Sequence, residues 1–348
     1  MASADPSLPH PHRASPSDCG PQLRRDPLTA TAVFLAPARG ARPIEFADTA
    51  ASGSTDDQQV ACPFCRGHEN LAPPSVLSLP EGGDWQARIV PNRYPIVGDS
   101  RTAVVTGEAM HSPLSGHPQP RPAVGVHEVL IESPEHDTRV EAIASTTWAI
   151  AWQAAHRRLQ SLADQPHLRW AMLFKNSGPK AGASLAHVHS QIVGLDFVPP
   201  AIQHKHARLR EDGHLHSQVL EAAVSDGRIW AEDEGLVAFV PTAARQPFET
   251  CIMPRLGEPH FHLAPAASVA AIARLTQRYA QRLSELTDGG NYNWWLHQAP
   301  FDDHDATTGW HWHLEIMPRL TQLAGFELGS GCHITTMPPQ EAAKLLRG

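Results

Sequence analysis

The decisive stretch of this chain is residues 176–191, which read Asn176-Ser177-Gly178-Pro179-Lys180-Ala181-Gly182-Ala183-Ser184-Leu185-Ala186-His187-Val188-His189-Ser190-Gln191. Its lead-in is rich in glycine and serine, and such a backbone can approach phosphate oxygens closely. In a strand, Gln191 shares a face with His189 and is placed to donate an amide hydrogen to a phosphoryl oxygen. We expect the rings of His187 and His189 to point to opposite sides and so to differ in role. One holds a metal or braces the structure, and the other faces a ligand as a nucleophile.

The composition excludes several classes of protein. The chain has 348 residues, enough for a large core or two domains, and a formal net charge of −8 at pH 7. This charge argues against a basic surface for nucleic acid. The chain contains no run of about 18 apolar residues, so no membrane span is predicted. Residues 1–23 are rich in Pro, Ser and His, as in a disordered tail rather than a signal peptide. We expect a cytoplasmic protein.

The remainder of the chain contains a weak internal repeat. Residues 88–95 resemble the segment that begins at 237, and residues 127–131 resemble residues 248–252. Self-similarity of this kind indicates a duplicated structural unit.

Each repeat continues with a long amphipathic pattern, which predicts helices over about 139–163 and 266–287. A strand, a loop and a His-x-His strand follow each helix. Strands on both sides of one helix, repeated twice, predict an α+β fold with two halves side by side, residues 24–200 and 201–348.

Cys62 and Cys65 have the Cys-x-x-Cys spacing of a zinc knuckle. A tetrahedral zinc needs two more ligands, for which His136 and His187 are the best candidates. A redox pair or an incidental pair of thiols is the alternative, although no helix is predicted to begin directly after the pair. A site closed by four protein ligands would be structural, and here it would orient His189.

A second group of histidines lies toward the C-terminus. Its members are His297, His304, His311 and His313, with His260 and His262 upstream. The residues leave open whether they hold a second metal or form a polar lining without one.

Several motifs occur in order along the chain. They are Arg25-Asp26-Pro27-Leu28, Arg39-Gly40-Ala41-Arg42-Pro43, Cys62-Pro63-Phe64-Cys65, Pro91-Asn92-Arg93-Tyr94-Pro95, residues 176–191, and His311-Trp312-His313 followed by Gly325-Phe326-Glu327. Over roughly residues 24–348 the series resembles the galactose-1-phosphate uridylyltransferase family of the histidine-triad superfamily, including ADP-glucose phosphorylase-like relatives. The resemblance implies two tandem histidine-triad-like halves, each a mainly antiparallel sheet with helices, and a homodimer.

The resemblance also implies a covalent ping-pong mechanism. His189 would attack the α-phosphorus of a nucleotide sugar, sugar 1-phosphate would leave, and a second phosphate-bearing acceptor would take the nucleotidyl group. Gln191 would hold a nonbridging phosphoryl oxygen. Substrate-binding residues implied in the same way are Arg39, Arg42, Asn92, Asn176 and Ser184. Turn-forming or surface roles are the alternative for these five residues.

Two metal sites follow from the same resemblance. Cys62, Cys65, His136 and His187 match a family zinc site. His297, His311 and His313 match ligands of a second metal that part of the family holds. A glutamate completes that second set, and near its position this chain has Lys205, with Glu211 further on.

We predict a UDP-glucose–hexose-1-phosphate uridylyltransferase. The motif His-Val-His-Ser-Gln departs from the His-Pro-His-Gly-Gln of typical uridylyltransferases. Serine at this position also occurs in relatives that resemble ADP-glucose phosphorylase, so adenylyl transfer from an ADP-sugar to phosphate is the alternative. A histidine-triad hydrolase or nucleotide-binding protein is a second alternative. In the second half Glu315 replaces the glutamine, and a carboxylate repels phosphate, so we expect that half to be supporting.

Overall fold

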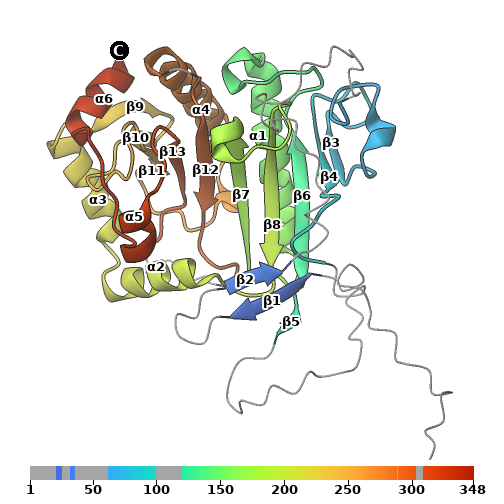
Figure 1. The fold of residues 1–348 in the computed structure, drawn as a ribbon, viewed down its shortest axis with the longest axis horizontal. Helices are drawn as coiled ribbons and strands as arrows, with labels where there is room; N and C mark the ends of the chain where they lie inside the picture. The colour runs from blue at the N-terminus through green and yellow to red at the C-terminus, as the bar shows by residue number, and fades with distance from the viewer. Residues whose placement is uncertain (1–20, 26–31, 36–61, 99–119, 288, 303–308) are drawn as a thin grey trace, which may run out of the picture.

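The computed structural model describes residues 21–25, 32–35, 62–98, 120–287, 289–302 and 309–348. Within these residues ten strands form one sheet in the order β3-β4-β6-β8-β7-β12-β13-β11-β10-β9, and all neighbours are antiparallel (Figure 1). A smaller sheet has the order β2-β1-β5.

The elements follow the chain in two comparable series. The first half contains β1 (Gln22–Arg25), β2 (Ala32–Leu35), β3 (Leu77–Leu79), β4 (Ala87–Pro91), β5 (Arg121–Pro122), β6 (Gly125–Ile131), α1 (Ser145–Ala163), β7 (Trp170–Ser177) and β8 (His189–Leu195). Helices α2 (Pro200–Glu211) and α3 (Leu215–Ser225) lead to β9 (Ile229–Asp233), β10 (Leu236–Phe239), β11 (Thr250–Pro254), α4 (Ala266–Leu286), β12 (Tyr292–His297), β13 (His313–Pro318), α5 (Gly325–Ser330) and α6 (Pro339–Arg347).

The strand order shows how the duplicated units are joined. Read inward from one edge it is β3-β4-β6-β8-β7, and from the other edge it is β9-β10-β11-β13-β12. In each series the long helix, α1 or α4, lies between the third and fourth strands of that series, counted in chain order. Pairing of β7 with β12 joins the two series into a single sheet. The expected α+β fold of two tandem, mainly antiparallel halves is therefore confirmed.

Helices α1 and α4 pack against each other through their apolar faces. The indole N–H of Trp148 on α1 donates to the carbonyl of Ala273 on α4 at 2.9 Å. The predicted second helix, 266–287, agrees with α4 almost to the residue, whereas α1 begins six residues later than the predicted 139. The reason is tertiary: Gln277 of α4 donates to the carbonyl of Ile143 at 2.7 Å, and Ile143 is extended.

The two faces of the central sheet have different environments. Cross-strand partners share a face, so Gln191, Phe174, Trp295 and Glu315 form one row across β8, β7, β12 and β13. The alternate residues face α1 and α4 and line the main core. His189 and His313 therefore lie on the face turned away from the two long helices.

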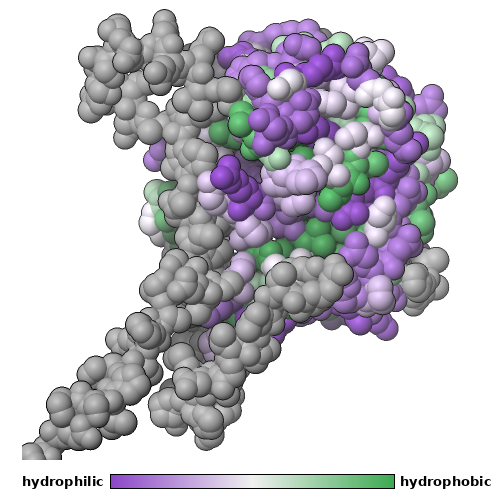
Figure 2. All heavy atoms as spheres, turned by 90° about the vertical axis from the view of Figure 1, so that its right-hand side faces the viewer, coloured by the Kyte–Doolittle hydropathy of each residue, from purple (hydrophilic) through white to green (hydrophobic). Residues whose placement is uncertain are grey.

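Residues 200–225, which lie between the two series of strands, contain α2 and α3. Residues 1–20 lie outside the described residues, and β1 begins at Gln22, inside the segment predicted as a tail. No helix among the described residues has the length and apolar character needed to span a membrane. Viewed from the β3 side, the described surface is mostly hydrophilic with smaller hydrophobic areas (Figure 2).

Candidate active site and metal centre

The predicted first-half metal ligands come together from three separate places in the sequence. Sγ of Cys65 lies 3.4 Å from Nδ1 of His136, and both thiol sulfurs lie 3.6 Å from Nδ1 of His187. All four ligand atoms are within 4.8 Å of one another. Bonds of about 2.0–2.3 Å at a tetrahedral zinc place its ligand atoms about 3.3–3.8 Å apart, so the donor set fits a zinc ion.

His187 is oriented as a metal ligand requires. Its Nε2 lies 3.0 Å from the carbonyl of Ser133, which can only accept, so Nε2–H donates and the lone pair is on Nδ1. Burial, and then the neighbouring His136, lower the pKa of His187 to about 4. The ring is therefore neutral at pH 7, the form in which imidazole coordinates metals.

His189 is held in one tautomer by its own backbone. Its Nδ1 lies 2.8 Å from the carbonyl of His187, so Nδ1–H donates and the lone pair is on Nε2. The ring is 8% exposed. Phe64, between the two cysteines, contacts the rings of both His187 and His189 edge-on, with centroids 5.8 and 5.4 Å apart. The loop that carries the metal ligands thus braces the predicted nucleophile directly.

The different roles of the two histidines arise because the strand is irregular before His189. In a regular strand, residues two apart share a face. Strand β8 begins only at His189, and His187 lies before it, where the backbone N–H of Val188 donates to the carbonyl of Asp137 at 2.8 Å. This bond ties the segment to the loop that carries His136, so the ring of His187 lies with His136 and the two cysteines.

A neutral network fixes the amide of Gln191. The backbone N–H of Ile96 donates to Nδ1 of His127 at 3.1 Å, so Nε2 of His127 carries the proton. That Nε2–H donates to Oε1 of Gln191 at 2.9 Å, and the Asn92 amide donates to the same oxygen at 3.4 Å. The carbonyl of Gln191 is therefore committed, and its NH₂ group is the end suited to a phosphoryl oxygen.

A buried ion pair lies behind the nucleophile strand, on the face of α1. Lys175 on β7 pairs with Glu132, and their side chains are 1% and 2% exposed. The Lys175 ammonium also donates to the carbonyl of His189 at 3.0 Å, and the Ser190 hydroxyl donates to Glu132. Burial lowers the pKa of Lys175, and the charge of Glu132 opposes that effect. The serine of the His-Val-His-Ser-Gln motif thus holds strand β8 to Glu132 on the face that packs against α1.

The remaining predicted substrate residues are placed in part. Phe174 pairs with Gln191, so Asn176, two residues further along β7, lies on the same face toward the His189 end of β8. Asn176 accepts a hydrogen bond from Asn293 at 2.8 Å. Ser184 is buried. Arg39 and Arg42 lie outside the described residues.

His304 lies outside the described residues, and the other second-half histidines, His297, His311 and His313, separate into two environments. His297 and His313 lie with Glu315 in a cluster whose ligand atoms are within 4.8 Å of one another. His311 instead donates through Nδ1 to the carbonyl of Pro254 at 2.8 Å, and its backbone N–H donates to His216. The expected group of His297, His311 and His313 is thus not the group that the structure brings together.

Comparison with known families identifies the chain. Residues 13–199, more than half of its length, match the galactose-1-phosphate uridyl transferase N-terminal domain. The chain belongs to the galactose-1-phosphate uridyl transferase family. Residues 150–346 also match a domain of unknown function, DUF4921.

This family member resembles enzymes of two named activities. It is 28% identical over 333 residues to the ADP-glucose phosphorylase of Arabidopsis thaliana, covering 94% of this chain and 92% of that one. It is 26% identical over 337 residues to the galactose-1-phosphate uridylyltransferase of Thermotoga maritima, covering 94% and 98%.

Solved structures agree with the fold. The crystal structure of the Arabidopsis thaliana ADP-glucose phosphorylase with bound ADP-glucose has a TM-score of 0.71, a sequence identity of 28% and coverage of 94% of this chain and 99% of that one. A uridylyltransferase structure has a TM-score of 0.73 at 24% identity, covering 94% and 97%. The predicted family and the predicted enzyme class, nucleotidyltransferase, are confirmed.

Sequence reasoning missed three residues that position this site: His127, Glu132 and Lys175. His127 lies in strand β6 and Glu132 directly after it, and Lys175 lies within β7, after the largely apolar residues at its start. Polar residues inside strands that are otherwise apolar were the available signal, because buried charges are rarely kept without partners.

Proposed function

We propose that this chain transfers a nucleotidyl group from a nucleotide sugar through a covalent intermediate on His189. The observation that carries the proposal is the hydrogen bond from Nδ1 of His189 to the His187 carbonyl, 2.8 Å long. It holds the lone pair on Nε2, on the face of the sheet that also carries the Gln191 amide. A neutral imidazole is a competent nucleophile near pH 7 without a separate base.

The first step forms one bond and breaks one. Nε2 of His189 bonds to the α-phosphorus, the bridging P–O bond breaks, and sugar 1-phosphate leaves with the electron pair. The carbonyl of His187 stabilises the positive charge that develops on the ring, and the NH₂ group of Gln191 donates to a nonbridging oxygen. Catalysis here consists of alignment and charge stabilisation, which is what phosphoryl transfer requires.

We further propose that Cys62, Cys65, His136 and His187 hold a structural zinc ion. The donor spacing and the hydrogen bond from His187 to the Ser133 carbonyl support this assignment. When bound, the ion would fix the loop around Phe64, which contacts the ring of His189.

Uridylyl transfer from UDP-glucose to a hexose 1-phosphate is the first candidate for the overall reaction. Adenylyl transfer from an ADP-sugar to phosphate is the second, and its support is the similarity to ADP-glucose phosphorylase at 28% identity, against 26% for the Thermotoga maritima uridylyltransferase over the same share of the chain. Ser190 does not decide between them by contact with the nucleotide, because its hydroxyl is bonded to Glu132 on the far face of the sheet.

The test is the intact mass of the full-length, zinc-supplemented protein after brief incubation with UDP-glucose or, separately, ADP-glucose, without an acceptor. We expect a uridylyl or adenylyl adduct on the native protein and none on His189→Ala. His313→Ala is the matched control, because it removes the corresponding histidine of the second half and should keep the adduct.

The acceptor is then identified by discharge of the adduct with hexose 1-phosphate or with inorganic phosphate. No adduct with either donor on folded protein would overturn the covalent mechanism for these donors. Steady release of nucleotide without an acceptor would favour the hydrolase alternative instead.

A further inference from the structure

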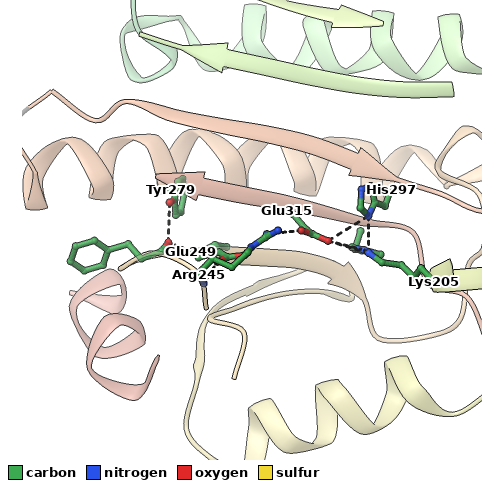
Figure 3. A network of polar contacts seen from close by, with 9 residues as sticks. Lys205, Arg245, Glu249, Tyr279, His297 and Glu315 are labelled. Carbon is green, nitrogen blue, oxygen red and sulfur yellow. Dashed lines mark hydrogen bonds and ion pairs between the residues drawn. The ribbon is translucent and has the colours of Figure 1, made fainter. Parts of the chain in front are cut away.

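The second-half cluster is built around a lysine. His297 lies on β12, His313 and Glu315 lie on β13, and Lys205 reaches them from helix α2 (Figure 3). The ammonium nitrogen of Lys205 lies 2.7 Å from Nδ1 of His297, 2.9 Å from Nε2 of His313 and 3.1 Å from Oε1 of Glu315. An ammonium group has three N–H donors, and this cluster supplies three acceptors.

The histidines are in the form that accepts these hydrogen bonds. Nδ1 of His313 donates to the carbonyl of His311 at 2.8 Å, which leaves Nε2 as the acceptor toward Lys205. Nδ1 of His297 and Nε2 of His313 therefore point at the ammonium as they would at a metal ion.

Charge is already balanced without a metal. Oε2 of Glu315 lies 2.7 Å from the guanidinium of Arg245, which also pairs with Glu249 (Figure 3). Two cations, Lys205 and Arg245, thus face two carboxylates. A divalent ion beside the ammonium would add uncompensated positive charge among half-buried and buried groups.

Two imidazole nitrogens and a carboxylate are nevertheless a common donor set for divalent transition metals. We infer that the Lys205 ammonium is the resident cation of this cluster, that the chain holds no metal there, and that shortening Lys205 opens a divalent-metal site made by His297, His313 and Glu315. In this arrangement the lysine ties helix α2, the link between the halves, to the second-half sheet.

The test is metal stoichiometry by elemental mass spectrometry, after the full-length protein is equilibrated with Zn²⁺ and freed of loosely bound ion. Lys205→Ala should retain one more equivalent per chain than the native protein. Arg208→Ala is the matched control, because it removes an exposed cation from the same helix without touching the cluster. Lys205→Ala combined with His297→Ala should return to the native value.

Cobalt(II) separates this site from the first-half site. A metal bound by Cys62 and Cys65 absorbs through thiolate charge transfer, whereas the second cluster contains no sulfur ligand. The additional cobalt in Lys205→Ala should therefore add only weak ligand-field bands. Failure of the proposed zinc site would remove the thiolate bands and leave this difference unchanged.

Two results would overturn the inference. One is a native protein that already binds the additional, thiolate-free equivalent. The other is a folded Lys205→Ala, judged by circular dichroism, that binds no more metal than the native protein. If Lys205→Ala does not fold, Lys205→Leu provides the same test, because leucine favours a helix, carries no charge and ends two atoms short of the lysine nitrogen.

Discussion

The two His-x-His segments share a backbone design and differ in where they keep charge. His189 and His313 each donate through Nδ1 to the carbonyl two residues earlier, at 2.8 Å in both cases. On the face of the sheet turned away from α1 and α4, His189 is accompanied by a neutral network around Gln191. In front of His313 stands Glu315 with cations on both sides.

On the opposite face of the sheet, which packs against α1 and α4, the first half carries the charged groups and the second half does not. Lys175, Glu132 and Ser190 form a buried charged network behind the first-half segment. The strand registers place Leu296 and Leu314 at the positions that correspond to Lys175 and Ser190, and both leucines are fully buried. The same backbone arrangement thus carries an uncharged face in the first half, where we propose that the phosphate binds, and a face that already holds a cation in the second half.

The largest effect is expected from removing the Lys175 ammonium, which pairs with Glu132 on the α1 side of the sheet. Lys175→Met leaves the buried Glu132 carboxylate without its partner and should reduce the free energy of unfolding by about 3–5 kcal/mol. Urea denaturation measures this loss.

Two variants sharpen the result. Lys175→Met combined with Glu132→Gln removes both charges, keeps an acceptor for Ser190, and should recover most of the stability. Arg157→Ala removes the partner of Glu81 in an exposed pair and should cost at most about 1 kcal/mol. A double variant as unstable as the single one would contradict the ion-pair explanation.

The next effect concerns the front of the two segments. Gln191→Glu gives the first half the carboxylate of the second, removes an amide donor and adds repulsion toward the phosphoryl group. We expect the rate of adduct formation to fall by about 10²–10³-fold, the usual cost of one lost transition-state donor. Rapid-quench mass spectrometry measures the rate.

The reciprocal variant is the control. Glu315→Gln gives the second half the amide of the first and should leave the rate of adduct formation within about threefold, because that half supplies no reacting group. Equal losses in the two variants would refute the division of labour between the halves.

A smaller effect is expected where the 3-10 turns before α1 and α4 differ. The turns are Val140–Ala142 and Phe261–Leu263, and both begin five residues before their helix. Glu141 in the first half therefore occupies the position that His262 occupies in the second. Burial, and then the nearby His260, lower the pKa of His262 from the ordinary 6.5 to about 4. Between these values the unfolded chain binds more protons, so stability rises with pH across this window and is lost as pH falls.

His262→Gln should therefore flatten the dependence of unfolding free energy on pH between about 4 and 6.5. The difference from the native protein should be on the order of 1 kcal/mol per pH unit at most. Urea midpoints at pH 5 and pH 7 measure it, and parallel curves for the two proteins would argue against a buried neutral His262.

Much of the fold was predictable because its signals are local. Amphipathic periodicity predicted both long helices, and only the start of α1 was displaced, by the contact of Gln277 with Ile143. The pairing of β7 with β12 was not predictable, because residues more than a hundred positions apart make it and no periodicity in either strand specifies the partner.

The site was predictable where its residues form motifs. The four proposed zinc ligands were named from spacing and resemblance, and the structure brings them together. His127 and Lys175 belong to no motif, and their roles depend on which strands become neighbours. The sequence shows that Lys205 lies near the position of the expected glutamate ligand. The convergence of three acceptors on its ammonium depends on tertiary packing and could not be predicted.

The pairing of β7 with β12 also has a consequence for solubility. Two separate five-stranded sheets would present four edge strands, each able to pair with another molecule. Joining the halves leaves two in the ten-stranded sheet of the described residues, β3 and β9. Strand β3 has only three residues and is followed by Pro80, while Arg347 donates to the carbonyl of Ile229 on β9. Duplication with a shared seam thus protects the protein against edge-to-edge aggregation.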